Sequence, residues 1–296
     1  MKIGIAGTGK MGTAIAGRLL LLGHEVAVWN RTEASAEGAR KLGASWAVTP
    51  QALVACSEVV IGLLTDEQAL DEVYLSAHGL LSGATHGKVF LEMSTVSPLK
   101  QQEMAKRVEA VGGIYIESPV GGSIGPAKEG KLMAFVGGDA AEVQKIKPLL
   151  DQMCRRVEHV GAHGSGSMMK LAINLPLMVY WQTLAEALSL IQPLGLEPKR
   201  VIDIFSDSSG GPNVLKNRGP LIAQTMIDGR SGTVNVPIDT VVKDIRSMLA
   251  HAQKLGVSLP LTSQALDVFS CAEQMGLGPA DSSEHLVWWQ EHNSSV

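Results

Sequence analysis

The sequence lacks several features that would assign it to a familiar class at once. It has no excess of basic residues, since 25 Lys and Arg stand against 29 Asp and Glu and the net charge is −4. This balance excludes the electrostatic footprint of a nucleic-acid-binding protein. Charged residues make up only 18% of the chain and hydrophobic residues 45%, which leaves no room for extended disorder. The chain is therefore expected to fold, and no nucleic-acid partner is expected.

Cysteine is also scarce, and neither cysteine nor histidine forms a metal-binding pattern. Cys56, Cys154 and Cys271 are far apart and show no CxxC spacing, so they are predicted to be buried thiols in a reducing compartment. His159 and His163 are four residues apart in HVGAH, but no third ligand is evident near them. The sequence predicts no metal site.

The sequence also shows no pattern that predicts a signal peptide or a membrane span. The start, MKIGIAG, has no charged region, apolar core or cleavage site. One long apolar stretch, residues 171–191, contains Asn174, Pro176, Gln182 and Glu186, and polar side chains are costly in lipid. We expect this stretch to be a buried helix between two domains, and the protein to be cytoplasmic without a membrane partner.

The first half alternates short apolar runs with amphipathic helical patterns. This alternation predicts a parallel sheet with helices on both faces, and the length of 296 residues suits one large or two ordinary domains. The fold class is therefore α/β, with a Rossmann-type doubly wound sheet in residues 1–162. The predicted strands are IGIA (3–6), VAVW (26–29), VVIGLL (59–64) and VFLEM (89–93), followed by IYIESPV, LMAFVGG and VEHVG.

The second half shows helical periodicity and no convincing strand. We expect residues 163–296 to form an all-helical domain. Its first long helix would begin near Gly164, and the last residues, 291–296, would be a frayed tail.

GTGKMG, residues 7–12, follows the first predicted strand and opens the first helix. Gly7 would allow a tight turn, Gly9 the approach of a pyrophosphate, and Gly12 close packing of helix and strand. Unpaired N–H groups at the helix start would then bind the phosphates. The motif predicts dinucleotide binding by all six residues: Gly7, Thr8, Gly9, Lys10, Met11 and Gly12.

WNRT, at the end of the second strand, bears on the choice of dinucleotide. An NAD-binding unit usually has Asp or Glu there to hold the ribose 2′-hydroxyl, but this chain has Asn30, Arg31 and Thr32. No carboxylate is present to repel a 2′-phosphate, and Arg31 could pair with it, so the sequence predicts NADP(H). The alternative is a surface arginine, with Asn30 and Thr32 capping the next helix.

GSGSMMKLAIN, residues 164–174, places a lysine and an asparagine in an apolar run. Lys170 and Asn174 are four residues apart, so they would share one face of a helix. On spacing alone they are either a snorkelling lysine beside a satisfied core amide or two polar groups that face a ligand.

Five motifs in this order resemble the β-hydroxyacid dehydrogenase family, which includes 3-hydroxyisobutyrate dehydrogenase and glyoxylate/succinic semialdehyde reductase. They cover nearly the whole chain, and WNRT and KLAIN look most like the NADPH-dependent reductase branch. The motifs are GTGKMG, MSTVSP (93–98), ESPVGGS (117–123), GSGSMMKLAIN and VPIDTVVKD (236–244).

The resemblance implies roles for several residues. Lys170 would be the catalytic residue and Asn174 would orient the substrate oxygen beside it. A hydride that arrives at a carbonyl carbon leaves negative charge on oxygen, which an ammonium can stabilise and protonate. The cofactor site would also include Leu64, Thr65, Thr95 and Lys243, and the substrate site Gly121, Gly122, Ser123, Val236 and Asp244. Without the resemblance, Thr95 reads as part of a helix cap and Lys243–Asp244 as an exposed charge pair.

Two positions depart from the family pattern, and a proline is unusual for a helix. Gly121 stands where the family usually has serine in the loop that holds the substrate carboxylate, although residues 121–123 still offer backbone N–H groups. Val236 stands where the reductase branch has an aromatic residue. Pro176 should kink the helix just after Asn174. The pocket is therefore expected to be roomier and more apolar.

The resemblance implies the NADPH-dependent interconversion of β-hydroxy acids and semialdehydes. It also implies a homodimer, in which the helical domain 163–296 serves substrate binding and dimerisation. Two hints of dimerisation, the apolar helix 171–191 and Trp288–Trp289, could equally be intramolecular core. An imine reductase shares the expected architecture but generally lacks the lysine. A non-catalytic nucleotide-binding sensor would need neither Lys170 nor Asn174.

Overall fold

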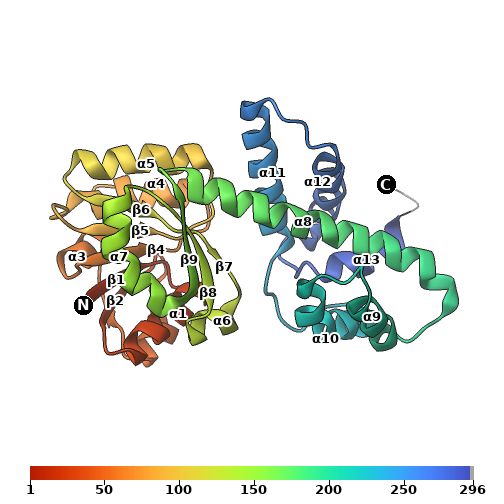
Figure 1. Ribbon diagram of the computed structural model, residues 1–296. Helices are drawn as coiled ribbons and strands as arrows, with labels where there is room; N and C mark the ends of the chain where they lie inside the picture. Colours follow the sequence, from red (N-terminus) through yellow and green to blue (C-terminus); the bar gives the residue numbers. More distant parts are fainter. Residues whose placement is uncertain (294–296) are drawn as a thin grey trace. The chain divides into compact units, whose positions relative to one another are not determined.

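The computed structural model describes residues 1–293 and contains two compact units, Met1–Lys170 and the part that follows from Leu171 (Figure 1). The first unit is built on a sheet and the second on helices, which confirms the expected fold class. The last residues of the predicted tail, 294–296, lie outside the described residues, whereas residues 291 and 292 belong to the final helix.

The first unit holds a sheet that, in the described residues, has nine strands in the order β3-β2-β1-β4-β5-β6-β8-β7, with β9 paired to β8. The chain passes from β1 outward through β2 to β3 and then returns to the other side of β1 with β4. This reversal is the point at which doubly wound sheets bind ligands. The strands are β1 (Lys2–Ala6), β2 (Glu25–Trp29), β3 (Ser45–Trp46), β4 (Val59–Gly62), β5 (Val89–Glu92), β6 (Ile114–Glu117), β7 (Val120–Gly121), β8 (Leu132–Gly137) and β9 (Cys154–Gly161).

Helices cover both faces of this sheet because successive strand residues point to opposite faces. Ile61 of β4 packs in one apolar cluster, together with residues of α1, α6 and α7, while the adjacent Val60 packs in another with residues of α3, α4 and α5. The helices are α1 (Lys10–Leu21), α2 (Glu37–Lys41), α3 (Pro50–Ala55), α4 (Glu67–Leu75), α5 (Pro98–Ala110), α6 (Ile124–Glu129) and α7 (Ala140–Met153), with short 3₁₀ turns η1 (Glu33–Ala36) and η2 (Leu80–Ser82).

The sheet is not parallel throughout. The strands β3, β2, β1, β4, β5 and β6 run parallel, as predicted, but β8 is antiparallel to both β6 and β7. The chain returns along β8 after only β7 and the one-and-a-half-turn helix α6, so no crossover helix is available to restore the direction. The strand β9 then pairs parallel with β8 after α7.

The second unit is helical throughout its described residues, apart from an isolated bridge between Pro237 and Asp281. Its core contains Trp181, Leu184 and Phe269, among other apolar side chains from most of its helices. The elements are the continuation of α8 (Ser165–Ile191), η3 (Gln192–Leu194), α9 (Pro198–Asp207), α10 (Asn213–Asp228), α11 (Ile238–Leu255), α12 (Pro260–Ala272), the π-helical turn η4 (Glu273–Leu277) and α13 (Glu284–His292).

The structure bears on the predictions for the long apolar helix, the tryptophans and the cysteines. The helix α8 runs without a break through Pro176, and no helix among the described residues is long and apolar enough to cross a membrane. Trp288 is only 4% exposed and belongs to the core of its own unit. Cys154 is buried as expected, but the expectation was wrong for the other two cysteines: Cys271 is only partly buried, and Cys56 is exposed because it lies in the polar turn after α3.

Candidate active site

The glycine-rich turn after β1 has the shape that a pyrophosphate requires. A Cβ atom at Gly7, where φ is +103°, would lie 2.2 Å from the Leu63 carbonyl oxygen, and one at Gly12 would lie 2.0 Å from that of Gly7. At Gly9 an added Cβ would meet nothing within 4 Å. Two glycines thus permit close packing of strand, turn and helix, while the third leaves open space. Gly9 is also the N-cap of α1 and offers no side chain to its first N–H groups, which suits an incoming phosphate.

Asn30 joins the end of β2 to this turn. Its Oδ1 accepts a hydrogen bond from the Thr8 N–H at 3.0 Å, and its Nδ2 donates to the Thr32 carbonyl at 3.0 Å. Thr32 occupies the N-cap of η1 but makes no side-chain cap bond. The Arg31 side chain is 79% exposed and forms an ion pair with Glu72 at 3.4 Å. Arg31 therefore lies at the surface beside the turn, and its present partner is easily exchanged.

Ser94 joins the loops after β4 and β5, and a buried carboxylate that the sequence did not suggest holds Ser94 in place. The Leu64 N–H donates to Ser94 Oγ at 2.6 Å, and the Ser94 N–H donates to Glu92 Oε1 at 2.9 Å. The Tyr74 hydroxyl donates to Glu92 Oε2 at 2.8 Å. Glu92 is fully buried, and this burial raises its pKa.

Thr65 and Thr95 follow these two strands. Thr65 Oγ1 donates to Asp66 Oδ2 at 2.9 Å, and Asp66 caps α4. The cap of α5 is Ser97, whose Oγ accepts from the Lys100 N–H at 3.3 Å. The capping alternative therefore applies to Ser97, which is the N-cap of α5.

The loop after β6 begins with a second buried glutamate. Glu117 is fully buried; its Oε1 accepts from the Gly166 N–H at 2.8 Å and its Oε2 from the Ser167 N–H at 3.3 Å. Burial raises the pKa of Glu117, and these two N–H groups oppose that rise. The first turn of α8 is thus fixed to the end of β6.

Gly121, Gly122 and Ser123 follow in the same loop. Gly121 lies in β7, opposite Met133, and Ser123 is the N-cap of α6. Gly122 has φ +126°, where glycine is strongly favoured. An added Cβ at Gly122 would lie 2.8 Å from Leu132 Cδ2. This turn therefore requires glycine both for its backbone conformation and for the space beside Leu132.

Lys170 and Asn174 lie on α8, one and two turns beyond the residues that Glu117 holds. Both side chains are half-buried. Since α8 is continuous from Ser165 to Ile191, the two side chains share one face of the helix, as their spacing predicted.

The predicted sites of the second unit surround the start of α11. Lys243 Nζ lies 3.2 Å from Asp244 Oδ1, and the Asp244 side chain is only 6% exposed. The alternative of an exposed charge pair is therefore wrong for Asp244, which packs in the core. Val236 is half-buried in the segment just before α11.

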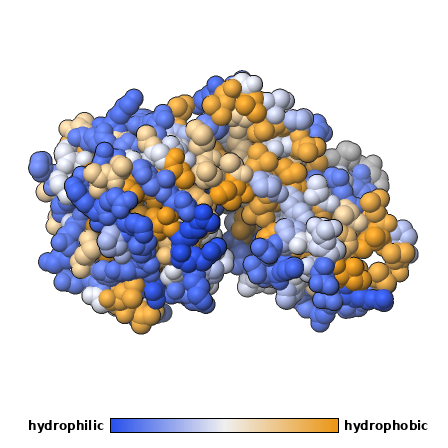
Figure 2. All heavy atoms as spheres, viewed as in Figure 1, coloured by the Kyte–Doolittle hydropathy of each residue, from blue (hydrophilic) through white to orange (hydrophobic). Residues whose placement is uncertain are grey.

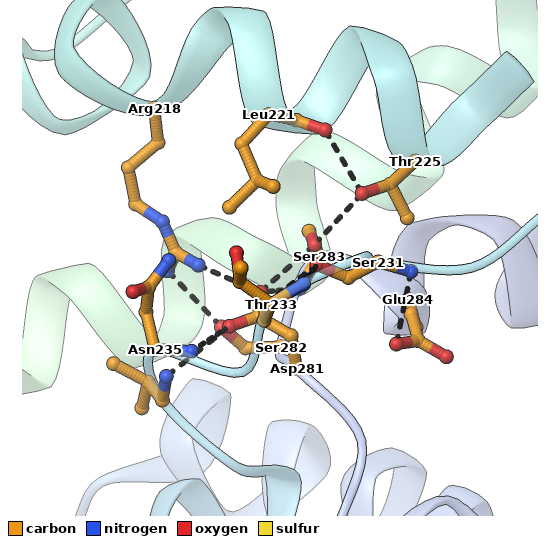
Figure 3. Close-up of polar contacts among 11 residues, drawn as sticks. Arg218, Leu221, Thr225, Ser231, Thr233, Asn235, Asp281, Ser282, Ser283 and Glu284 are labelled. Carbon is orange, nitrogen blue, oxygen red and sulfur yellow. Dashed lines mark hydrogen bonds and ion pairs between the residues drawn. The ribbon is translucent and has the colours of Figure 1, made fainter. Parts of the chain in front are cut away.

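A buried clamp holds this segment (Figure 3). Arg218 Nη2 lies 2.6 Å from Asp281 Oδ1, while Asp281 Oδ2 accepts from the N–H groups of Asn235 at 2.6 Å and Val236 at 3.2 Å. Burial would raise the pKa of Asp281, but hydrogen bonds from Ser283 and Asn235 and the charge of Arg218 outweigh it and hold the pKa below its usual value. The residues around Val236 are therefore firmly positioned.

Metal binding has no support in the described residues, where no group of three or more His, Cys, Asp or Glu side chains could hold an ion. His159 Nε2 contacts the carbonyl oxygens of Gly138 and Gly161, and His163 Nε2 contacts that of Tyr115 at 2.9 Å. Since carbonyls only accept, these histidines act as donors to the backbone.

In the first unit, the predicted residues gather at one edge of the sheet. Each predicted segment follows the carboxyl end of a strand near the reversal of strand order. These segments are 7–12 after β1, 30–32 after β2, 64–65 after β4, 95 after β5 and 121–123 a few residues after β6. Such an edge, with a glycine-rich turn that a pyrophosphate fits, defines a dinucleotide-binding protein of the Rossmann type.

Comparisons with known proteins define the family. Residues 2–161 match the NAD-binding domain of 6-phosphogluconate dehydrogenase, and residues 164–289 match the NAD-binding region of NADP-dependent 3-hydroxyisobutyrate dehydrogenase. The chain is 32% identical to 3-hydroxyisobutyrate dehydrogenase of Pseudomonas aeruginosa, over 92% of either chain. It is 30% identical to glyoxylate/succinic semialdehyde reductase 1 of Arabidopsis thaliana, over 96% of each.

A solved structure has a similar fold. Psf3 in complex with NADP⁺ and 2-OPP superposes with a TM-score of 0.86 at 26% identity, covering 96% of this chain and 98% of the other. The chain belongs to the β-hydroxyacid dehydrogenase family. It is an NAD(P)-dependent oxidoreductase that acts on CH–OH groups of hydroxy acids.

Proposed function

We propose that this enzyme interconverts β-hydroxy acids and semialdehydes with NADP(H), and that Lys170 moves the proton. The observation that carries the proposal is the placement of α8: its first turn is bound by Glu117 at the dinucleotide edge of the sheet, and Lys170 follows one turn later. Asn174 lies on the same face of the helix, one turn beyond.

The chemistry of Lys170 follows from the charge that develops on the substrate. The bound nicotinamide would supply or accept the hydride. In reduction, the Lys170 ammonium would stabilise the negative charge on the carbonyl oxygen and give it a proton. In oxidation, the neutral amine would accept the proton of the alcohol. The amide of Asn174 would hold the oxygen in line by hydrogen bonding.

The preference for NADP(H) rests on the end of β2. The first three residues after this strand, Asn30 to Thr32, include no carboxylate, and Arg31 is exposed beside the glycine-rich turn. Its ion pair with Glu72 joins two exposed side chains, and such pairs contribute little to stability. Arg31 can therefore turn to a 2′-phosphate at small cost. Psf3, the structural relative, was solved with NADP⁺.

The substrate is proposed to be a small carbonyl compound that carries a carboxylate. The backbone N–H groups of residues 121–123 would receive the carboxylate, and the Val236 segment and Asp244 would line the remainder of the pocket. Gly121 lacks the hydroxyl usual at its position, and Val236 is smaller than an aromatic residue. Both changes favour a larger or more apolar acid. Lys243 is proposed to reach the cofactor.

A homodimer is proposed as the working form. In Figure 2, apolar side chains gather in patches on the surface of the helical unit. Large apolar residues that are exposed there include Ile173, Leu190, Leu194, Ile204 and Leu261. A second copy of the chain could cover such a surface. Light scattering with size-exclusion chromatography would report the mass of the particle.

A substrate panel tests the proposed reaction. Purified protein would be mixed with NADPH and, separately, succinic semialdehyde, glyoxylate, the semialdehyde of 3-hydroxyisobutyrate and a cyclic imine. We expect oxidation of NADPH with at least one of the aldehydes and little with the imine. Turnover confined to the imine would favour an imine reductase. Tight binding of NADPH without turnover across a broad carbonyl panel would favour a sensor.

A further inference from the structure

Glu117 lies between two parts of the proposed active site. It is the last residue of β6, directly before the loop that leads to Gly121, and its carboxylate accepts both hydrogen bonds that the first turn of α8 sends to it. Lys170 is four residues after Gly166 and three after Ser167, so all three belong to the first turns of one helix.

The backbone around Glu117 is shaped for its carboxylate. A Cβ atom at Gly137 would lie 2.1 Å from Glu117 Oε1, and one at Gly166 would lie 2.4 Å from the Phe135 carbonyl oxygen. Neither distance is possible for real atoms. Glycine at both positions therefore lets the carboxylate and the helix start approach closely, and leaves the first turn of α8 little room to shift.

The other side of Glu117 is equally fixed. The N–H of Ser118, the next residue, donates to the Glu92 carbonyl at 2.7 Å, and the Phe135 N–H donates to the Pro119 carbonyl at 3.1 Å. The start of the 118–123 loop is therefore tied to β5 and β8. Glu117 joins this loop to α8 through a single side chain.

We propose that Glu117 is a positioning residue, which holds the first turn of α8 so that Lys170 faces the carbonyl oxygen of a substrate bound by the 121–123 loop. This inference rests on the proposed role of Lys170. A carboxylate suits the task because it only accepts hydrogen bonds and because its negative charge matches the positive end of a helix.

Stability alone explains Glu117 less well. Burying an ionised carboxylate is costly, and apolar or neutral replacements of buried charges are often neutral or stabilising. Burial indeed raises the pKa of Glu117. The carboxylate is retained at this cost, which is consistent with a task that a neutral side chain performs less well.

The test is the variant Glu117→Gln, with Glu92→Gln as its matched control. Glutamine keeps the size of the side chain but faces one of the two N–H donors with an NH₂ group, so the first turn should move. We expect kcat to fall about 10- to 100-fold, because small misplacements of a reacting group are that costly, with the Kd for NADPH nearly unchanged. Glu92 is equally buried but holds Ser94, whose hydroxyl accepts from the Leu64 N–H, so Glu92→Gln should weaken NADPH binding instead.

A double-mutant cycle separates this inference from the proposed function. If Glu117 acts through Lys170, adding Glu117→Gln to Lys170→Ala should cost almost nothing further. Independent, multiplying losses would overturn the inference, as would a folded Glu117→Gln enzyme with normal kcat or one that loses kcat and NADPH binding together. A Lys170→Ala enzyme with normal turnover would instead reject the proposed function.

A second variant covers the case in which Glu117→Gln does not fold. Gly166→Ala keeps the carboxylate but forces the first turn of α8 away from the Phe135 carbonyl. It should lower kcat and spare NADPH binding, as measured by fluorescence titration. Unchanged kcat in the folded variant would overturn the inference as well.

Discussion

At the scale of single residues, the proposed preference for NADP(H) rests on Arg31. The Arg31 side chain is exposed and pairs with Glu72 at 3.4 Å. Arg31 follows β2, which lies beside β1 in the sheet, and the glycine-rich turn follows β1. A hydrogen bond to a charged group contributes roughly 1.5–3 kcal/mol. The loss of one such bond should therefore be measurable in cofactor affinity.

Replacing Arg31 by Ala should raise the KM for NADPH about ten-fold or more and leave the KM for NADH almost unchanged. Steady-state kinetics with both cofactors would measure the change. Arg40→Ala is a suitable control, because Arg40 is also exposed and pairs with Glu33 at 2.8 Å. Equal catalytic efficiency of the wild type with NADH and NADPH, together with a silent Arg31→Ala, would refute the preference.

At the scale of elements, the connection between α10 and α11 depends on Asp281. Its carboxylate accepts from two backbone N–H groups of the 235–236 segment and pairs with Arg218, whose guanidinium carbon also lies 4.9 Å above the ring of Trp181. Removing one partner of a buried ion pair leaves the other charge uncompensated.

Arg218→Leu should lower the free energy of unfolding by about 3 kcal/mol, since breaking a buried pair is strongly destabilising. Urea unfolding followed by tryptophan fluorescence would give the value. In the control, Arg246→Leu removes a pair in which Arg246 is 57% exposed, and its effect should be within about 1 kcal/mol. Equal losses of unfolding free energy in the two variants would show that the buried pair contributes no more than an exposed one.

The elements differ in how far the sequence could predict them. The central strands and the helix α7 were predictable because uninterrupted apolar runs and amphipathic periods mark buried strands and surface helices. The two-residue strands β3 and β7 and the six-residue helices α3 and α6 are too short to show a period. The reversed direction of β8 depends on pairing with β6 and β7, which no local pattern contains.

The candidate site was also only partly predictable. The glycines of the 7–12 turn and the spacing of Lys170 and Asn174 are visible in the letters. Glu92 and Glu117 were missed. The hydrogen-bond partners of Glu117 lie about fifty residues away in the chain, and Glu92 contacts Tyr74 of another element, so neither contact is visible in a local pattern. The one available signal was a carboxylate at the end of each of two apolar runs, VFLE and IYIE.

At the scale of the whole molecule, the stability of the helical part should depend on pH through His285. This residue is fully buried, its ring stacks on Phe269 at 3.9 Å between centroids, and its Nε2 contacts Gln182 Oε1 at 2.7 Å. Burial lowers the pKa of His285 from 6.5 to about 3. The folded state therefore keeps the neutral ring while the unfolded state becomes protonated below pH 6.5.

The contribution of neutral His285 is present above pH 6.5 and is lost as the pH falls towards 3. Below pH 6.5 the unfolding free energy should fall by about 1.4 kcal/mol per pH unit from this group. The raised pKa values of Glu92 and Glu117 act in the opposite sense. Urea titrations of wild type and His285→Gln at pH 7 and pH 5.5 would isolate the histidine, because the carboxyl contributions cancel in the difference. A pH slope identical in both proteins would contradict this account.

The most direct test of the central claim is the rate of hydride transfer in Lys170→Ala, measured in a single turnover with preloaded NADPH and the best aldehyde from the panel. We predict a fall of at least about 100-fold, since a positioned general acid contributes that much, with unchanged NADPH affinity. Lys199→Ala, which removes an exposed lysine of α9, should behave as wild type. A Lys170→Ala enzyme that binds NADPH and transfers hydride at the wild-type rate would contradict the account.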